Sequence, residues 1–316
     1  MKLGILCSRI RLEEKLIFKA LRERGVEYDR LDERHLALQL QANGLTKGVC
    51  PEHSEGYDLI WCRSISHSRA LYTLGILNGW GVRTVNSYQV VHTCGDKVLT
   101  TTALIRNGIP TPRTVVTFSV EAALQAIEEM GYPVVLKPAV GSWGRLLSKI
   151  NDRETAEAVL RHKQTLGGYQ HSIFYIQEYI AKPERDIRTM VVGEEVVYAM
   201  YRRSAHWITN TARGGETLPC LLSSEIRELS LAAAQAVGGG ILAVDLMETA
   251  DGRLLVNEVN HTPEFHGAMR AVNVDIAGKM ADYVLQLVGW SGGPWSGGQV
   301  SLSTIRPSDQ DKRGLC

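Results

Sequence analysis

The feature that most constrains the fold is a regular alternation of short apolar runs with longer segments of helical spacing in the N-terminal part of the chain. The run KLGILC (2–7) precedes EEKLIFKALRERG (13–25), whose apolar residues recur every three to four positions. DLIWCR (58–63) and RALYTLGILNGWG (69–81) repeat the pattern. Strands that alternate with helices of this length predict a parallel sheet covered by helices on both faces.

The length of 316 residues is too great for one ordinary domain and predicts two or three. We expect an α/β domain over 1–93, a small α+β domain over 94–172, and a strand-rich domain over 173–288. The remaining segment, 289–316, is rich in Gly, Ser and Pro without a sustained period, and we expect it to be disordered or loosely attached.

Composition narrows the class of protein. Hydrophobic residues make up 44% and charged residues 22%, as in globular domains. A net charge of +1 gives no reason to expect nucleic acid as a partner. No apolar run is long enough for a membrane span and the first residues lack a signal-peptide core, so we expect a cytoplasmic protein that does not contact a membrane. The six cysteines form no C-x-x-C pair, and we expect most to be reduced and buried; a catalytic thiol is the lesser alternative.

Oxygen-bearing side chains interrupt two apolar strands near the end of the chain. The segments 239–249 and 254–262 are separated by the turn sequence ADGR, which predicts an antiparallel hairpin. Side chains at i and i+2 share one face of a strand, so Asp245, Glu258 and Asn260 should converge. Such oxygen donors are the ligands that Mg²⁺ prefers. The alternative is a pair of ordinary solvated acids, which the apolar surroundings disfavour.

Cationic and glycine-rich segments complete a candidate phosphate site. Lys97 starts a helix, and Lys137 ends an apolar strand directly before a loop that contains GSWGR (141–145). Glycines let backbone amides approach phosphate oxygens, and a lysine supplies a point charge. Each motif is weak alone. The segment QEYI (177–180) is either an edge strand or a segment whose backbone groups contact an adenine. Asp186 is a candidate contact for a ribose hydroxyl.

The order of these motifs resembles the ATP-grasp superfamily of carboxylate–amine ligases over about residues 1–288. The segments CGDK, VLKPAVGSWGRLL, IQEYI…RDIR, YRRSAHWITNTARGG and VNEVNHTPEF are similar to the RimK-related branch, and in particular to LysX-type ligases of lysine biosynthesis. Those ligases join α-aminoadipate to the C-terminal glutamate of a small acidic amino-group carrier protein, LysW. The resemblance implies an acyl phosphate intermediate and no nucleophile from the protein.

The resemblance also implies a three-domain ATP-grasp fold with ATP held between the central and C-terminal domains, two Mg²⁺ ions, and the following sites. ATP contacts would come from Lys97, Lys137, Gly141, Ser142, Gly144, Gln177, Glu178, Tyr179, Ile180 and Asp186. The Mg²⁺ ligands would be Asp245, Glu258 and Asn260. Catalytic contacts to phosphate and the transition state would come from Arg202, Asn210 and Arg213. Substrate contacts would come from Arg188, Arg203, His206 and Thr262, with a structural histidine as the alternative for His206.

The substrates are less constrained than the chemistry. Ile208 stands where ribosomal-protein glutamyl ligases of this branch usually carry a basic residue, which disfavours that substrate. The segment HGAM (266–269) departs from LysX-type sequences, which leaves the acceptor open between α-aminoadipate and glutamate or another amino acid. We expect a homo-oligomer, either a dimer or a tetramer. A basic entrance for the acidic carrier is expected from Arg185, Arg188, Arg202, Arg203 and Arg213.

Overall fold

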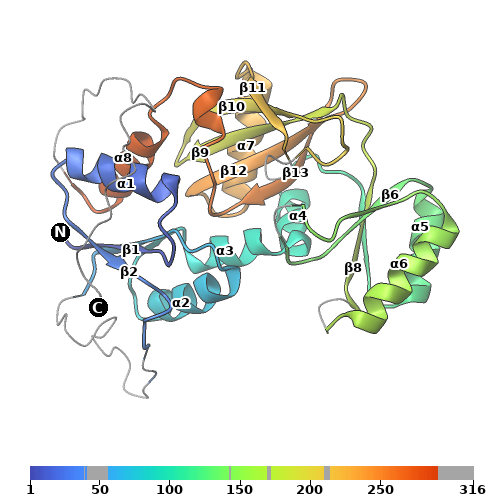
Figure 1. Cartoon of the computed structure of the whole chain (residues 1–316), viewed down its shortest axis with the longest axis horizontal. Helices are drawn as coiled ribbons and strands as arrows, with labels where there is room; N and C mark the ends of the chain where they lie inside the picture. The colour runs from blue at the N-terminus through green and yellow to red at the C-terminus, as the bar shows by residue number, and fades with distance from the viewer. Residues whose placement is uncertain (39, 41–55, 142–143, 169–171, 210–213, 291–316) are drawn as a thin grey trace. The chain divides into compact units, whose positions relative to one another are not determined.

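The computed structural model describes residues 1–38, 40, 56–141, 144–168, 172–209 and 214–290. The described chain divides into two compact units (Figure 1). The first combines residues 1–88 with the segment that starts at Glu264, and the second contains residues 89–263. The predictions for Ser142, Asn210, Arg213 and most of the tail concern positions outside the described residues.

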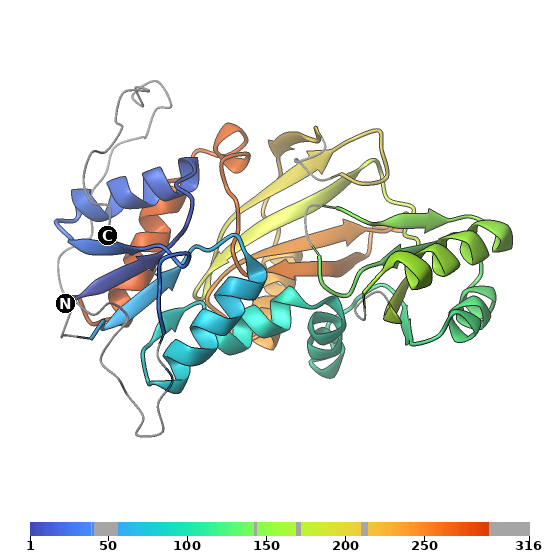
Figure 2. The ribbon, with the colours of Figure 1, turned by 60° about the horizontal axis from the view of Figure 1, so that its bottom comes forward.

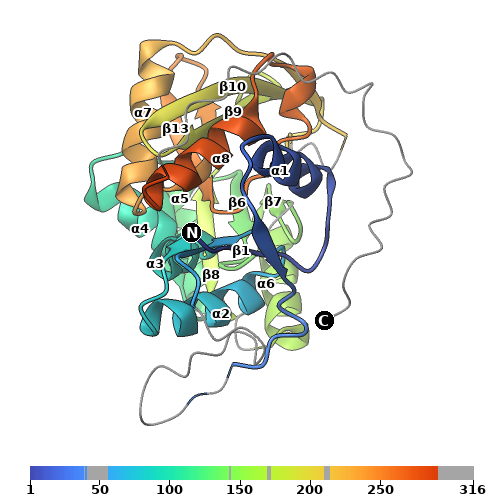
Figure 3. The ribbon, with the colours of Figure 1, turned by 90° about the vertical axis from the view of Figure 1, so that its left-hand side faces the viewer.

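The first unit is built on a four-stranded parallel sheet, as the alternating pattern predicts. The strand order is β2 (Tyr28–Leu31), β1 (Leu3–Leu6), β3 (Leu59–Cys62), β4 (Thr84–Val85). Its helices are α1 (Leu12–Glu23), α2 (His67–Gly79) and α8 (Ile276–Leu287), and a 3₁₀ turn covers Ala268–Arg270. Figure 3 shows α1 and α8 on one side of the sheet and α2 on the other. Because α8 packs against α1, the last helix belongs to this unit rather than to the domain of residues 173–288.

A buried ion pair anchors the start of α1 to the sheet. Glu14 accepts hydrogen bonds from the backbone and side chain of Arg11, and its carboxylate lies 3.0 Å from Nη2 of Arg63. The side chains of Glu14 and Arg63 are 0% and 1% exposed. The neighbouring Glu13 carboxylate lies 2.6 Å from Nδ1 of His266. The first residue of the HGAM segment therefore contacts the N-terminal turn of α1.

The second unit contains a small antiparallel sheet covered by two helices. The strand order is β5 (Thr114–Thr117), β8 (Phe174–Glu178), β6 (Val134–Lys137), β7 (Ser148–Ile150), with helices α5 (Val120–Met130) and α6 (Arg153–Leu166). Ser119 caps α5, whereas α6 is capped by Asp152. Leu136 and Ile176 belong to the apolar core under these helices. Lys137 and Gln177, one position along each strand, therefore project toward the opposite face. Because β8 lies between two strands, the edge-strand alternative for QEYI is wrong.

A larger antiparallel sheet forms the rest of the second unit (Figure 2). Its order is β11 (Glu216–Pro219), β10 (Glu195–Arg203), β9 (Arg185–Val192), β12 (Ile241–Glu248), β13 (Leu254–Asn260). Helices α3 (Tyr88–Gly95), α4 (Lys97–Arg106) and α7 (Ser224–Ala236) accompany it. Ile187 and Val244 pack in the core with α7, so the alternating neighbours Asp186, Arg188 and Asp245 occupy the other face. One face of this sheet is thus apolar and the other is charged.

The described helices and cysteines bear on two expectations from composition. None of the described helices has the length and apolarity that crossing a bilayer requires. Cys7, Cys62 and Cys94 are buried free thiols, as expected, and burial raises the pKa of Cys62 to about 11. That shift disfavours a thiolate nucleophile at this position.

Candidate active site

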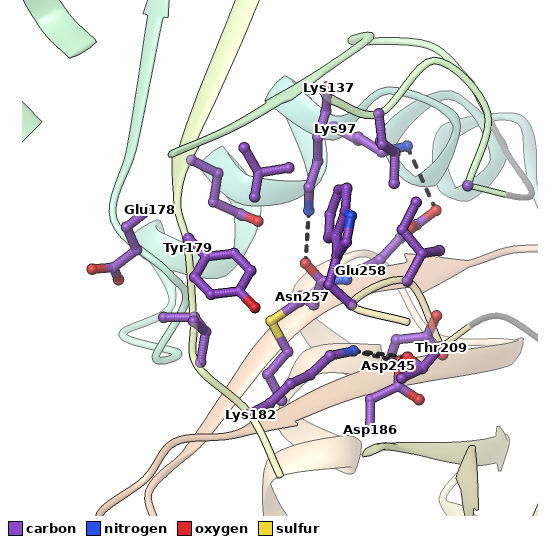
Figure 4. Close-up of a pocket in the computed structure, with 18 of the residues that line it drawn as sticks. Lys97, Lys137, Glu178, Tyr179, Lys182, Asp186, Thr209, Asp245, Asn257 and Glu258 are labelled. Atoms are coloured by element: carbon purple, nitrogen blue, oxygen red, sulfur yellow. Dashed lines mark hydrogen bonds and ion pairs between the residues drawn. The ribbon is translucent and has the colours of Figure 1, made fainter. Parts of the chain in front are cut away.

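A pocket lies in the second unit, between the uncovered faces of its two sheets (Figure 4). Its empty volume is about 750 Å³, open mouth included, which is in the range of nucleotide-sized ligands. Eleven of the predicted ATP and metal residues line it: Lys97, Lys137, Gly141, Gly144, Gln177, Glu178, Tyr179, Ile180, Asp186, Asp245 and Glu258. Residues between positions 97 and 258 are therefore brought to one cavity, because the two sheets face each other across it.

Two lysines enter the pocket from the same side (Figure 4). Lys137 is 6% exposed, and its ammonium donates a 2.8 Å hydrogen bond to Oδ1 of Asn257. Burial lowers the pKa of Lys137 to about 7, because removal from water disfavours the charged form. Lys97 begins α4, which Asp96 caps, and its ammonium donates to the Gly141 carbonyl at 2.8 Å and lies 3.6 Å from Glu258. Both cations are placed for phosphate oxygens.

A β-bulge in the hairpin of β12 and β13 sets the opposite wall. Asp245 pairs directly with Glu258, and the register then shifts so that Leu246 pairs with Val256. Asn257 is the extra residue. The bulge lets two consecutive residues, Asn257 and Glu258, both line the pocket, which strict alternation forbids.

Acids and bases alternate beneath this hairpin in a buried network. The Asp186 carboxylate accepts from Arg202 at 2.6 and 2.8 Å, and it also accepts a hydrogen bond from the Thr209 hydroxyl. Arg202 is 2% exposed and also lies 3.1 Å from Asp245. Arg188 donates to both oxygens of Asp245, at 2.7 and 2.9 Å. Burial alone raises the pKa of Asp245, but the two guanidinium groups outweigh it and hold that pKa below its usual value.

The hairpin residues are suited in kind to a hard cation such as Mg²⁺. Asp245 and Glu258 stand opposite each other on adjacent strands, and Asn260 follows two positions later. The Asn260 amide nitrogen is buried with no hydrogen-bond partner among the described residues. No three Asp, Glu, His or Cys side chains gather into a metal site within the described ranges. A cation here would therefore rest on two carboxylates and an amide.

The predicted loop and strand residues differ in where their functional groups point. The Glu178 carboxylate accepts from the backbone N–H of Arg113 at 2.6 Å, and Figure 4 shows it turned away from the lysines. The Tyr179 ring projects toward the cavity in the same view, and its face carries the Lys149 ammonium at 3.8 Å. The tyrosine is thus an apolar surface with a fixed orientation, suited to a flat base.

Six predicted residues do not line this pocket: Arg188, Arg202, Arg203, His206, Asn260 and Thr262. Arg202 is a partner of two buried acids rather than a group that faces the cavity. The exposed His206 accepts a hydrogen bond from the backbone N–H of Ile208 at its Nδ1, as its structural alternative describes. Thr262 bonds to the adjacent His261 ring.

Other pocket residues escaped the sequence analysis, notably Asn257, Lys182, Trp207, Thr209 and Met247. Lys182 lies 2.7 Å from the Thr209 hydroxyl and 3.5 Å from Asp186, and burial lowers its pKa. Its spacing of four from Asp186 was a possible signal, although such spacing is common in solvated segments. The sequence carried no signal for Asn257, because an alternating pattern of apolar residues does not reveal a β-bulge.

Most of the arginines expected to form a basic entrance are paired with acids. Arg188 and Arg202 are paired with Asp245 and Asp186, and Arg185 lies 2.9 Å from Glu248. The charges of Arg188 and Arg202 are thus neutralised by buried acids, and Arg185 is paired near the surface. Arg203 is exposed, with no ion pair among the described residues, so it alone of the four described arginines offers an unopposed charge to a partner.

Comparisons with known proteins identify the family and the fold. A RimK-like ATP-grasp domain matches residues 94–284, and a LysX preATP-grasp domain matches residues 3–93. The chain therefore belongs to the RimK-like ATP-grasp family, and it is an ATP-dependent carboxylate–amine ligase. The expected ATP-grasp fold is confirmed.

Individual relatives extend the match to most of the chain. Glutamate–LysW ligase ArgX of Sulfurisphaera tokodaii is 36% identical over 286 residues, which cover 90% of this chain and 98% of that protein. Alpha-aminoadipate–LysW ligase LysX of the same organism is 31% identical over 281 residues, covering 88% and 95%. A crystal structure of a RimK domain ATP-grasp protein from Sphaerobacter thermophilus has a TM-score of 0.72 at 26% identity, covering 90% of this chain and 99% of that one.

Proposed function

We propose that this ligase joins the amino group of an acidic amino acid to the C-terminal glutamate of a small acidic carrier protein resembling LysW. The observation that carries the proposal is the pocket between the two sheets, where the buried Lys137 and the half-buried Lys97 face a row of oxygen donors. This arrangement separates sites for phosphate and for metal within one cavity. Full-length similarity to two kinds of LysW ligase supports the carrier as the substrate that supplies the carboxylate.

The chain's own residues bind and orient ATP in this proposal. Lys97 and Lys137 hold phosphate oxygens, with backbone amides from the loop that contains Gly141 and Gly144. Tyr179 and Ile180 flank the adenine, while Asp186 lies close enough to the cavity for the ribose. We assign Mg²⁺ to Asp245, Glu258 and Asn260, where it would neutralise phosphate charge when bound. The number of ions stays a prediction.

The reaction needs position and charge rather than a protein nucleophile. The carrier carboxylate attacks the γ-phosphorus of ATP, ADP leaves, and an acyl phosphate forms. The amine of the second substrate then attacks the acyl carbon, releases phosphate and leaves an amide. The buried Lys137 and the half-buried Lys97 are preorganised for the charge that accumulates, because a pocket of low dielectric strengthens their interaction with it.

The acceptor has two candidates, which differ by one methylene. The resemblance of the sequence motifs favours α-aminoadipate. The match that covers 90% of the chain to a glutamate ligase favours glutamate as the second candidate. One methylene in a pocket changes specificity by only about 10- to 200-fold, so both acids should react at measurable rates.

Ligation assays with purified carrier test the proposal. The enzyme, ATP, Mg²⁺ and an acidic carrier ending in glutamate are incubated with either acid, and the carrier mass is followed. The expected result is a mass increase of one amino acid together with ADP formation, and the ratio of kcat/KM identifies the acceptor. A carrier that lacks the terminal glutamate is the control. If free glutamyl dipeptides react as well as the carrier, the carrier assignment is wrong and a small-molecule ligase replaces it.

A further inference from the structure

The two predicted carboxylate ligands of the metal are each in contact with a cation of the protein itself. Arg188, Asp245 and Glu258 lie in one row across β9, β12 and β13, because Arg188 pairs with Asp245 and Asp245 pairs with Glu258. Arg188 is bidentate on Asp245, and Lys97 lies 3.6 Å from Glu258. The acids are therefore neutralised by protein cations in this structure.

The bond to Arg188 uses the oxygen atoms that a metal would need. Its Nε and Nη2 donate to Oδ1 and Oδ2 of Asp245, and Arg202 Nη2 also lies 3.1 Å from Oδ2. Mg²⁺ binds oxygen at about 2.0 to 2.1 Å in near-octahedral geometry, which a carboxylate clasped by two guanidinium groups does not readily allow. Withdrawal of one guanidinium would free carboxylate lone pairs for the metal.

Burial indicates which of the two arginines withdraws. The Arg202 side chain is 2% exposed and is also tied to Asp186 by two hydrogen bonds, so its release would leave two buried acids short of a partner. The Arg188 side chain is 15% exposed, and among the described residues its side-chain hydrogen bonds both go to Asp245. Arg188 is the less costly one to move.

We propose that Arg188 binds Asp245 while the metal is absent and leaves it when a divalent cation and nucleotide bind. The freed guanidinium of Arg188 then becomes available to a substrate carboxylate. This inference rests on the proposed function, since it takes Asp245 as a metal ligand. It makes Arg188 a positioning residue that couples the loading of the metal site to capture of the substrate. The exchange keeps a positive partner beside Asp245 in both states, which avoids an unpaired buried carboxylate.

Metal affinity tests the exchange without relying on turnover. Mn²⁺ binding is measured by electron paramagnetic resonance in the presence of AMPPNP for wild type, Arg188→Lys and Arg188→Met. Lysine keeps the charge but replaces the two-point fork by a single contact. If Arg188 competes for Asp245, both variants should bind Mn²⁺ about tenfold more tightly, since charge-assisted bidentate bonds are among the strong ones. Arg185→Lys, on the same strand but paired with Glu248, is the matched control and should match wild type.

The variants separate competition from simple repulsion between positive charges. If only Arg188→Met tightens Mn²⁺ binding, the arginine acts through its charge at a distance and the exchange is overturned. Unchanged affinity in both variants overturns it as well.

A second readout follows the guanidinium directly. In a ¹⁵N NMR spectrum, the Arg188 Nε–H signal, assigned by its loss in Arg188→Lys, should shift when Mg²⁺ and AMPPNP are added together. A signal that stays in place while nucleotide binds would contradict the withdrawal. Failure of wild type to bind AMPPNP or Mn²⁺ at all would instead overturn the proposed function, and the inference with it.

Discussion

The ammonium of Lys137 on β6 donates a 2.8 Å hydrogen bond to Oδ1 of Asn257 on β13, and this bond connects the two sheets of the second unit across the pocket. Burial of a charged lysine costs free energy unless an anion or hydrogen-bond acceptors compensate for the lost water. A lysine held this way by a neutral amide is poised to exchange that partner for a phosphate oxygen.

Replacing Lys137 by methionine should separate function from stability. We expect kcat/KM for ATP to fall by about 10²- to 10³-fold, the usual loss for one preorganised charge contact. The free energy of unfolding should change by less than about 1 kcal/mol, because an apolar side chain of similar length fills the site and the half-buried Asn257 remains accessible to water. Steady-state kinetics and urea unfolding measure the two quantities.

Lys163→Met provides the comparison for that experiment. Lys163 is half-buried on α6, near the Phe174 ring, and is not among the residues that line the pocket. Its replacement should leave ATP kinetics unchanged. A similar loss in both variants would show that Lys137 acts through the fold and not through the nucleotide.

The two acids of the hairpin should respond differently to substitution. Asp245 is 4% exposed between two guanidinium groups, so Asp245→Ala leaves the half-buried Arg188 without its partner and removes one of the two partners of the buried Arg202, and should cost about 3 to 5 kcal/mol of unfolding free energy. The Glu258 side chain is 24% exposed, and Glu258→Gln should cost less than about 1 kcal/mol. Both should weaken Mn²⁺ binding and abolish ligation.

Chemical denaturation and Mn²⁺ titration on the same protein preparations check this pair. Glu258→Gln that binds Mn²⁺ as tightly as wild type would remove Glu258 from the metal site. Equal stability of Asp245→Ala and wild type would show that the arginines find other partners.

Acid should destabilise the first unit through Glu14. Burial alone raises the pKa of Glu14, but Arg11 and Arg63 outweigh it and hold the pKa below the usual 4.5. A lowered folded pKa means that the stabilisation is present above about pH 4.5 and is lost as pH falls through the folded value. Glu14→Gln should lose about 3 kcal/mol at pH 7, and its stability should fall less steeply with acid than that of wild type.

Urea unfolding between pH 7 and pH 3.5 measures this dependence, with Glu157→Gln as the control. Glu157 forms an exposed pair with Arg153 on α6, so its replacement should cost less than about 0.5 kcal/mol. Parallel pH profiles for wild type and Glu14→Gln would contradict the assignment.

Salt should weaken the use of an acidic carrier only modestly. Exposed charges are screened over about 8 Å at physiological ionic strength, so the KM for the carrier should rise with NaCl. Because most of the described arginines near the site are paired, we expect a rise of only about two- to threefold between 50 and 300 mM. ATP affinity should change less, and Arg203→Gln should reduce the salt effect. A KM that does not respond to salt would argue against electrostatic steering.

Local patterns in the sequence were sufficient for many of the elements, and the order of the motifs was sufficient for the class of chemistry. Apolar alternation predicted the parallel sheet of the first unit, and ADGR predicted the hairpin that sets Asp245 opposite Glu258. These features depend on neighbours in sequence, which share one strand, one turn or one helix face. The outer strands β2 and β4 were not predicted, because β4 has only two residues and β2 contains charged ones.

The partners of the charged side chains were decided only by the tertiary structure. The sequence alone predicts that Arg188 and Arg202 are cations available to substrate. It also predicts that Asn257 lies on the face of its strand opposite to Glu258. The sheet register places Arg188 against Asp245, Arg202 against Asp186, and a bulge turns Asn257 toward Lys137. Sequence determines which charges the chain carries, whereas burial and long-range strand pairing determine which of them neutralise each other, because a charge removed from water must find a partner wherever the fold brings one.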